Sequence, residues 1–135
     1  MIFRAVVSGS IKARCPTLIL VDTSIWIDHF RSSNNRLVLL LDADMVCMHS
    51  LVVGELACGN LADRANTIYL LKSLPRAAVA SDDEVLFFID QHRVAGKGLG
   101  YLDMHLLAAA ALASLKVWTR DRRLGEVSTS LGLNA

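Results

Sequence analysis

Four acidic residues stand at the ends of apolar segments, and their positions indicate a shared site. These residues are Asp22, Glu55, Asp103 and Asp121. Asp22 is the only charged residue between Leu18 and Ile27, and Asp121 follows the strand-like segment that begins at Val117. A carboxylate in an apolar setting is costly unless it has a partner or a metal ion. We therefore expect the four side chains to form one acidic pocket.

The chemistry of such a pocket follows from its charge. Carboxylates that lie close together repel one another, so at neutral pH they need a cation to stay ionised together. Oxygen ligands without a His or Cys cluster favour Mg²⁺, with Mn²⁺ as a possible substitute. An ion held in this way activates water and neutralises charge on a phosphoryl group. The pattern predicts hydrolysis of phosphodiester bonds, and the sequence has no P-loop, Gly-x-Ser-x-Gly or His-Glu-x-x-His motif that would indicate another chemistry.

Each acid also has a purely structural interpretation. Asp22, Asp103 and Asp121 could each cap a helix or favour its positive end without any role in a site. Glu55 is harder to explain in this way, because its neighbours on a helical face are apolar. Each aspartate taken alone favours the structural interpretation, whereas the four positions taken together favour the site.

Short apolar runs alternate with helical patterns along the chain. We expect strands at residues 18–21, 45–48, 77–80 and 116–119, and a further strand in the tail. The expected helices cover about 23–31, 36–41, 50–59, 62–74, 82–94 (opened by the capping box Ser81-Asp-Asp-Glu84) and 101–115, with a short one in the tail. This alternation predicts an α/β domain with a mainly parallel sheet of four to five strands. Ligands bind beyond the carboxyl ends of such strands, where Asp22 and Asp121 are expected.

Length and hydropathy indicate one domain with an exposed apolar surface. The chain has 135 residues, of which 53% are hydrophobic, and a mean hydropathy of +0.43. No run approaches the roughly 18 apolar residues of a membrane span, so we expect a cytoplasmic protein that uses its apolar excess at an oligomer or partner interface. Trp26 and Phe30 lie four residues apart on one helix, which fits core packing or a partner groove. Residues 1–16 are expected to form an N-terminal extension and residues 17–135 the domain.

Basic residues near the expected site could contact a nucleic acid, or could simply be solvated surface charges. They are Arg93 and Lys97, around the glycine-rich loop 96–100, and Arg120, Arg122 and Arg123, which flank Asp121. Arginine suits phosphate contact because its planar fork binds two oxygens at once. The four histidines and three cysteines show no metal-ligand spacing.

The segment Leu20-Val-Asp-Thr-Ser-Ile-Trp-Ile-Asp28 resembles the opening of PIN-domain ribonucleases, in particular the VapC-type toxins of bacterial toxin–antitoxin pairs. The likeness continues in Ser50-Leu-Val-Val-Gly-Glu-Leu56 and Leu102-Asp-Met-His-Leu-Leu-Ala-Ala-Ala110. It closes with Thr119-Arg-Asp-Arg-Arg-Leu124, so that it covers residues 18 to about 133 in the expected order. The extension at residues 1–16 is a departure, since such toxins usually start close to the first strand.

The resemblance implies a three-layer α/β/α fold and a single-strand-selective endoribonuclease that uses Mg²⁺. Asp22, Glu55, Asp103 and Asp121 would take the four acid positions of the family. Thr23 or Ser24, together with Thr119, would support the pocket by hydrogen bonds. The implied partners are an RNA substrate, a second copy of the chain and a cognate VapB-type antitoxin that wraps the first helices.

Two other functions are alternatives: a binding module, and a phosphotransfer domain of the haloacid-dehalogenase or receiver type. A PIN-like module could hold RNA or a protein without cutting, although the presence of all four acids argues against it. A phosphotransfer domain of the haloacid-dehalogenase type would need a second aspartate two residues after Asp22, where this chain has Ser24. A receiver domain would need paired acids near the first strand, which are missing as well.

Overall fold

Three short parallel strands form the centre of the structure, a computed structural model that describes residues 17–135. They are β1 (Ile19–Val21), β2 (Val46–Cys47) and β3 (Lys116–Trp118), in the spatial order β2-β1-β3. The central strand β1 is buried along its whole length. Its uninterrupted apolar sequence is what a parallel strand covered on both faces requires.

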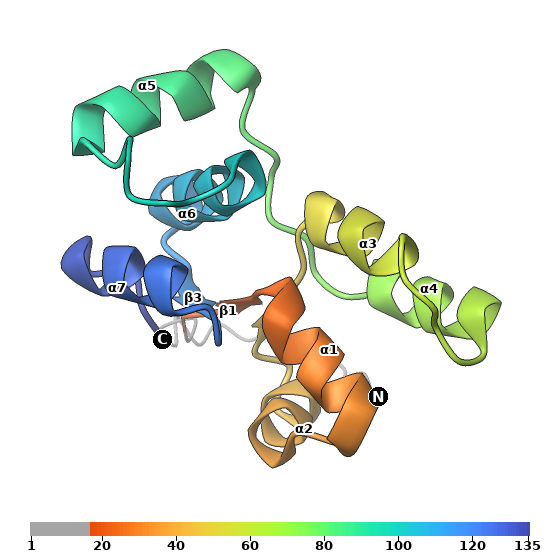
Figure 1. The fold of residues 1–135 in the computed structure, drawn as a ribbon. Coiled ribbons are helices and arrows are strands. Elements are labelled where there is room, and N and C mark those ends of the chain that lie inside the picture. Colours follow the sequence, from red (N-terminus) through yellow and green to blue (C-terminus); the bar gives the residue numbers. More distant parts are fainter. Residues whose placement is uncertain (1–16) are drawn as a thin grey trace, which may run out of the picture.

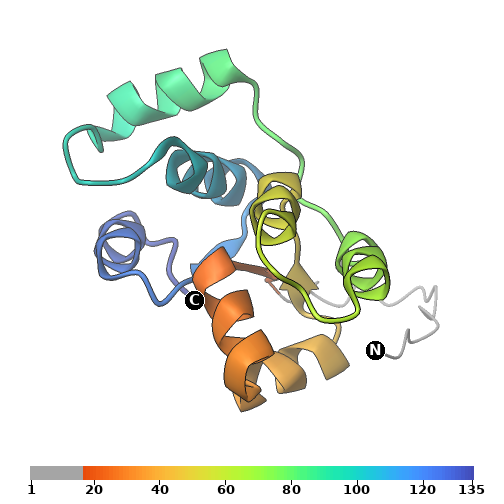
Figure 2. The ribbon, with the colours of Figure 1, turned by 45° about the vertical axis from the view of Figure 1, so that its right-hand side comes forward.

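Seven helices surround this sheet in the described part of the chain (Figure 1). They are α1 (Thr23–Ser32), α2 (Asn35–Asp42), α3 (Ser50–Ala57), α4 (Arg64–Lys72), α5 (Asp82–His92), α6 (Tyr101–Ala113) and α7 (Arg122–Ser130). In the order β2-β1-β3, the chain moves in one direction across the sheet from β1 to β2 and in the opposite direction from β2 to β3. Both connections are expected to be right-handed, so the helices of the two connections lie on opposite faces of the sheet. Figures 1 and 2 show α1 and α2 on one side of β1, and α5 and α6 on the other. The α/β class expected from the sequence is confirmed.

The sheet is narrower than the four to five strands expected. Residues 77–80 form no strand, and the chain makes a single parallel bridge just before them, between Met48 and Arg76. Only the first and last residues of 77–80 are buried, so the segment lacks the alternation of a half-buried strand. Its alanines also have a low preference for strands. The strand expected in the tail is likewise reduced to one bridge, between Val117 and Asn134.

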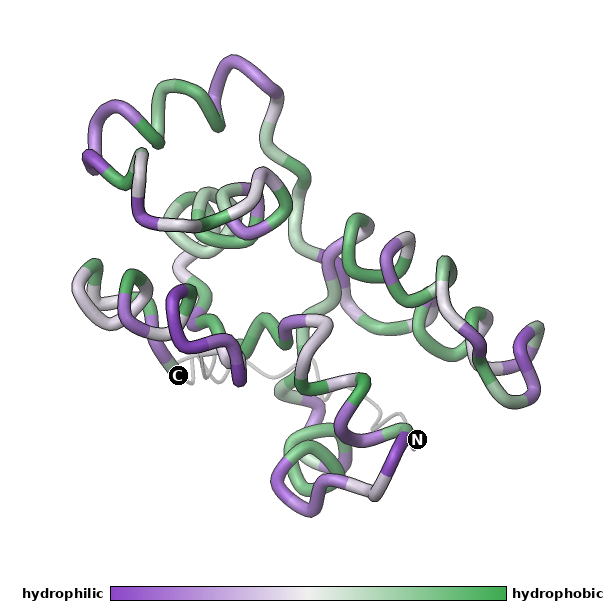
Figure 3. Tube along the Cα trace, in the orientation of Figure 1, coloured by the Kyte–Doolittle hydropathy of each residue, from purple (hydrophilic) through white to green (hydrophobic). Residues whose placement is uncertain are grey.

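Helix α6 is the central helix of the domain, as its sequence predicts. Figure 3 shows it in the colour of apolar residues over most of its length. Residues 104–110 are all buried, and the helix packs against both α5 and β3. Because α6 is held on several sides, its first turn is a fixed platform, and Asp103 lies in that turn.

Two further expectations concern the ends of the chain and the membrane. The proposed extension, residues 1–16, lies outside the residues that the structure describes. Among residues 17–135, no helix combines the length and the apolar content that crossing a bilayer requires.

Candidate acidic active site

Asp22 lies where the carboxyl ends of β1 and β3 meet. It directly follows β1, and its backbone amide donates to the carbonyl oxygen of Trp118, at a distance of 2.9 Å. The residue is only 5% exposed. As the residue that precedes α1, it also caps that helix, with a 3.4 Å contact from the Ser24 amide to Oδ2. The sequence thus places a buried carboxylate at the end of the sheet where ligands bind in parallel α/β folds.

Two hydroxyl groups fix the orientation of the Asp22 carboxylate. Ser24 Oγ and Thr119 Oγ1 each donate to Asp22 Oδ2 at 2.7 Å. Each hydroxyl accepts in turn from a backbone amide, that of Arg120 for Ser24 and that of Asp121 for Thr119, both at 2.9 Å. Because these amides occupy hydroxyl lone pairs, the hydroxyl protons are directed at Asp22. The network therefore ties the start of α1 to the segment that leads into α7.

Of the two hydroxyl residues considered after β1, Ser24 makes the hydrogen bond and Thr23 does not. The Oγ1 atom of Thr23 is buried and has no hydrogen-bond partner among the described residues. The first-turn geometry of α1 points Ser24 toward Thr119 across the sheet end, with 3.3 Å between the two hydroxyl oxygens. Sequence alone could not choose between the two, because the choice depends on where β3 ends relative to β1.

Asp103 and Asp121 lie at the starts of α6 and α7, and each is held by a backbone amide. Asp103 Oδ2 accepts from the Gly100 amide at 3.0 Å, and Asp121 Oδ1 accepts from the Leu124 amide at 3.0 Å. The capping interpretation of the aspartates is therefore correct, but it uses only one oxygen of each. Within residues 17–135, Oδ1 of Asp22, Oδ1 of Asp103 and Oδ2 of Asp121 accept no hydrogen bond. These oxygens stay free for another ligand.

The pKa of Asp103 reflects its burial and the charges of the other three acids. Partial burial raises the pKa of the Asp103 carboxyl, the hydrogen bond from the Gly100 amide opposes this, and the charges of the other three acids raise the pKa further. Those three are Asp22, Asp121 and Glu55. Carboxylates from three other segments of the chain are thus close enough to repel Asp103. The amino-terminal ends of α1, α6 and α7 lie at this site and partly offset the repulsion.

The four acids differ in burial, which the sequence did not predict. Asp22 is buried and Asp103 is half-buried, but Glu55 on α3 and Asp121 are exposed. The apolar neighbours of Glu55 in the sequence turn toward the core, while its own side chain lies on the outer face of the helix. The side chain of Glu55 makes no salt bridge or hydrogen bond to the described residues, although its backbone carbonyl accepts from the Cys58 amide. We call the exposed acids, Glu55 and Asp121, the rim of the acidic site, and Asp22 is its buried member.

The four carboxylates are suitable ligands for a hard divalent cation, but their side chains do not converge on one point. Carboxylate oxygens are the ligands that Mg²⁺ and Mn²⁺ prefer, and every acid of the pocket has at least one free oxygen. However, no three His, Cys, Asp or Glu side chains in residues 17–135 are arranged to hold a metal ion. The residues thus fit Mg²⁺ by chemical type, and binding would require the rim side chains to turn inward.

The histidines nearest the pocket are core residues. His49 and His105 are both buried, with their ring centres 6.0 Å apart. His49 Nδ1 accepts from the Leu51 amide and so caps α3, the helix that carries Glu55. Burial lowers the pKa of His49, and the charge of His105 lowers it further. A neutral His49 keeps the lone pair that caps the helix, which gives this histidine a structural role.

The five basic residues expected to contact RNA fall into two groups. The side chain of Arg120 pairs with Asp28, and Arg122 Nε donates to Glu126 at 2.9 Å. The other three, Arg93, Lys97 and Arg123, line one cleft. Sequence reasoning did not identify Gly98, which lies against Arg123. Its place between two other glycines just before Asp103 is the signal that could have indicated a close backbone approach.

Comparison with known proteins gives one family and one fold. The PIN domain family matches residues 19–129. Ribonuclease VapC32 of Mycobacterium tuberculosis is 42% identical over 117 residues, which is 86% of this chain and 94% of that protein. Among solved structures, PAE2754 of Pyrobaculum aerophilum has a TM-score of 0.59 at 17% identity, covering 82% of this chain and 84% of that one. FitAcB of Neisseria gonorrhoeae has a TM-score of 0.58 at 22% identity, covering 83% and 94%. These two structures show a shared fold.

Proposed function

Because the chain belongs to the PIN-domain family and is of the VapC type, we propose that it is a metal-dependent endoribonuclease toxin. It cleaves single-stranded RNA in the cytoplasm, with Mg²⁺ as cofactor and Mn²⁺ as a substitute. One observation carries the proposal: acids from three other segments lie close enough to Asp103 to raise the pKa of its carboxyl, and the acids keep oxygens free of hydrogen bonds. The name of the relative from M. tuberculosis, a ribonuclease, supports RNA as the substrate.

The residues of the pocket would have two roles, binding the cation and orienting the Asp22 carboxylate. Asp22, Asp103, Asp121 and Glu55 would hold the cation with their free oxygens. When bound, the cation would activate a water molecule and neutralise charge on the scissile phosphate. Ser24 and Thr119 keep Asp22 Oδ2 occupied, so that Oδ1 is the oxygen presented to the site. This preorganisation removes the cost of orienting the buried ligand during binding.

Cleavage should depend on a divalent cation and leave a 3′-hydroxyl and a 5′-phosphate. The reason is that a metal-activated water attacks phosphorus directly, whereas attack by the ribose 2′-hydroxyl needs no metal and leaves a cyclic phosphate. Purified protein is incubated with a pool of structured RNAs in Mg²⁺, in Mn²⁺ and in EDTA, and the product ends are sequenced. An Asp103→Asn protein purified in parallel controls for contaminating nucleases. Activity that survives EDTA, or 2′,3′-cyclic ends, would refute the metal-activated water.

The runner-up function is a PIN-like module that binds RNA or protein without cutting. One observation favours it, namely that the acids as they stand do not form a closed metal site. The same experiment separates the two functions. RNA that is bound but left intact at high concentrations of Mg²⁺ and Mn²⁺ would decide for the non-catalytic module.

A groove between α1 and α4 is the proposed docking site of a cognate VapB-type antitoxin. It encloses about 260 Å³ and is lined mainly by apolar side chains, including Trp26, Phe30 and Leu70. Phe30 is 43% exposed, although it contacts the buried Trp26 ring at a centroid distance of 6.0 Å. The Nε1 atom of Trp26 is buried without a hydrogen-bond partner among the described residues. An amphipathic segment could cover these rings and offer an acceptor to this nitrogen.

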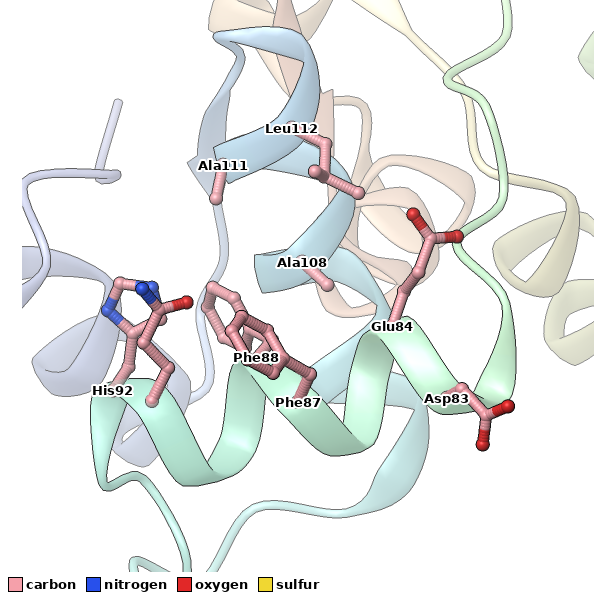
Figure 4. A pocket seen from close by; sticks show the side chains of 9 residues that line it. Asp83, Glu84, Phe87, Phe88, His92, Ala108, Ala111 and Leu112 are labelled. Carbon is pink, nitrogen blue, oxygen red and sulfur yellow. The ribbon is translucent and has the colours of Figure 1, made fainter.

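A second apolar surface, on α5 and α6, is the proposed contact between two copies of the chain. Phe87 is 66% exposed and Leu112 is 64% exposed. Figure 4 shows Phe87 and Phe88 of α5 and Ala108 and Leu112 of α6 around one pocket. Large apolar side chains gathered on one face of two adjacent helices are typical of an interface.

Two substitutions should separate antitoxin binding from dimerisation. Phe87→Glu places a charge on the α5–α6 face, so it should give a monomer that still binds the antitoxin. Phe30→Glu places a charge in the α1–α4 groove and removes an aromatic anchor. The variant should remain a dimer and bind the antitoxin at least about 100-fold more weakly. Light scattering after size exclusion, with and without the antitoxin encoded beside the gene, measures both. A monomeric parent would refute the dimer, and Phe30→Glu with parent-like affinity would refute the groove.

A further inference from the structure

A cleft between the end of α5, the α5–α6 loop (residues 93–100) and α7 carries three cationic side chains. It encloses about 410 Å³, a size typical of ligand pockets. We call it the basic cleft and define it by Arg93, Lys97 and Arg123, which line it. Figures 1 and 2 both show the loop running between α5 and α7. The three cations come from a helix end, a loop and a second helix, so the fold brings them together.

The charge of the basic cleft is not neutralised by neighbouring acids. None of its three cations forms a salt bridge within residues 17–135. The acid that lines the cleft, Glu126, accepts from Arg122 Nε at 2.9 Å and is thus engaged with another arginine. Three cations that share one cleft repel one another, and a bound anion would relieve that repulsion.

Two short chain connections place the basic cleft beside the acidic pocket. Arg123 follows Asp121 by two residues in the first turn of α7. On the other side, Gly98 contacts Arg123, and Gly100, whose amide holds Asp103, is two residues further on. Two residues span at most about 7 Å. A strand bound at the acids can therefore extend to Arg123.

The backbone of the loop is shaped to fit Arg123. Gly98 has a φ of +79°, and a Cβ atom at this position would lie 2.8 Å from both Cδ and Nη1 of Arg123. Glycine is the residue that adopts this conformation without strain and leaves room for the guanidinium group. Gly98 thus leaves the space that the Arg123 side chain occupies.

We propose that the basic cleft binds the phosphate backbone of the RNA strand whose scissile bond lies at the acidic pocket. The proposal rests on the proposed ribonuclease function and adds where the strand runs. An acidic pocket repels RNA, which is a polyanion, so a ribonuclease with such a pocket needs another site that attracts the strand. Cations one or two nucleotides away supply the attraction that the pocket lacks, and they do so without reading the base sequence.

The test measures RNA affinity as a function of salt concentration. A labelled single-stranded RNA is titrated with Asp103→Asn protein in Mg²⁺, a background that does not cleave, and with the same protein carrying Arg93→Gln, Lys97→Gln and Arg123→Gln. The triple variant should bind at least about tenfold more weakly at physiological salt, and the slope of log K against log salt should fall by about 0.7 for each cation removed. Lys72→Gln, an exposed cation at the end of α4, is the matched control and should change neither quantity.

A substitution that keeps the charge tests the geometry. Gly98→Ala should displace the Arg123 side chain, so it should weaken RNA binding several-fold with no change in net charge. In the cleaving parent, the triple variant should raise KM and leave kcat nearly unchanged, as expected for lost ground-state binding.

The outcomes separate this proposal from the function on which it rests. If the parent cleaves RNA and the triple variant binds with the affinity and salt slope of the Lys72→Gln control, the basic cleft is not an RNA site and the ribonuclease assignment stands. If the triple variant binds RNA normally but loses the antitoxin, the cleft is a site for an acidic protein segment. If the parent neither binds nor cleaves any RNA, both proposals fall.

Discussion

Asp103→Asn is expected to reduce RNA cleavage by at least about 1,000-fold while leaving the metal-free protein as stable as the parent or more stable. Loss of a charged group at a reacting centre costs this much in comparable sites. Asparagine keeps an oxygen that can accept from the Gly100 amide, so the start of α6 retains its capping contact. What the substitution removes is one of four negative charges that repel one another.

The sign of the stability change follows from the pKa of Asp103. Burial and the other three acids raise the pKa of this carboxyl above its unfolded value. A raised carboxyl pKa favours the folded state below the unfolded pKa of about 4, and this contribution is lost as pH rises through the folded pKa. The parent loses this contribution as pH rises through that interval, whereas the asparagine variant has no such group to ionise. Because Asp103 is half-exposed and screened by water, we expect a gain of about 1 kcal/mol or less.

Thermal and urea unfolding of parent and variant at pH 4 and pH 7.5 measure this difference. In EDTA the advantage of Asp103→Asn should appear at pH 7.5 and shrink toward pH 4. Mg²⁺ binds only the folded site, so it should raise the Tm of the parent and much less that of the variant. Should Asp103→Asn lose substantial stability in EDTA at pH 7.5, Asp103 would be a structural residue and the shared acidic pocket would be wrong.

The sequence predicts those parts of the site that depend on residues close together along the chain. A lone acid directly after an apolar run predicts a carboxylate at a strand end, and Asp22 lies there. The capping box that opens α5, between Ser81 and Glu84, is equally local, and both of its hydrogen bonds form. Such features depend on residues within a few positions of one another, which the sequence displays directly.

The parts that the sequence did not predict depend on contacts between distant segments. The hydrogen bond that selects Ser24 over Thr23 comes from Thr119, 95 residues away along the chain. The strand expected at residues 77–80 fails because pairing to β2 ends after one bridge. The burial of Glu55 was misjudged because apolar neighbours along a helix do not reveal which face meets the core. The approach of Gly98 to Arg123 joins a loop to another helix.

Asp22→Ala is expected to destabilise the protein strongly, in contrast to Asp103→Asn. The Asp22 carboxylate accepts from two hydroxyl groups and one amide, and it is buried. Alanine would leave Ser24 Oγ and Thr119 Oγ1 without their acceptor and would remove the cap of α1. Unsatisfied, partly buried donors and a lost cap each cost about 1–2 kcal/mol, so the free energy of unfolding should fall by about 2–4 kcal/mol.

Asp22→Asn is the matched control, and it separates the structural role of Asp22 from its role as a ligand. The amide oxygen of asparagine can take the place of Oδ2 and accept from Ser24 and Thr119, so most of the stability should be retained. The amide nitrogen would then stand where Oδ1 faces the pocket, and a nitrogen that only donates cannot bind a cation. In urea unfolding with EDTA, the free energies of unfolding of the parent and Asp22→Asn should therefore be similar, and that of Asp22→Ala should be much lower. Both variants should fail to cleave RNA. If Asp22→Ala were as stable as the parent, repulsion among the four acids would outweigh the hydrogen bonds at the end of the sheet, and Asp22 would be held in place only by the metal ion it binds.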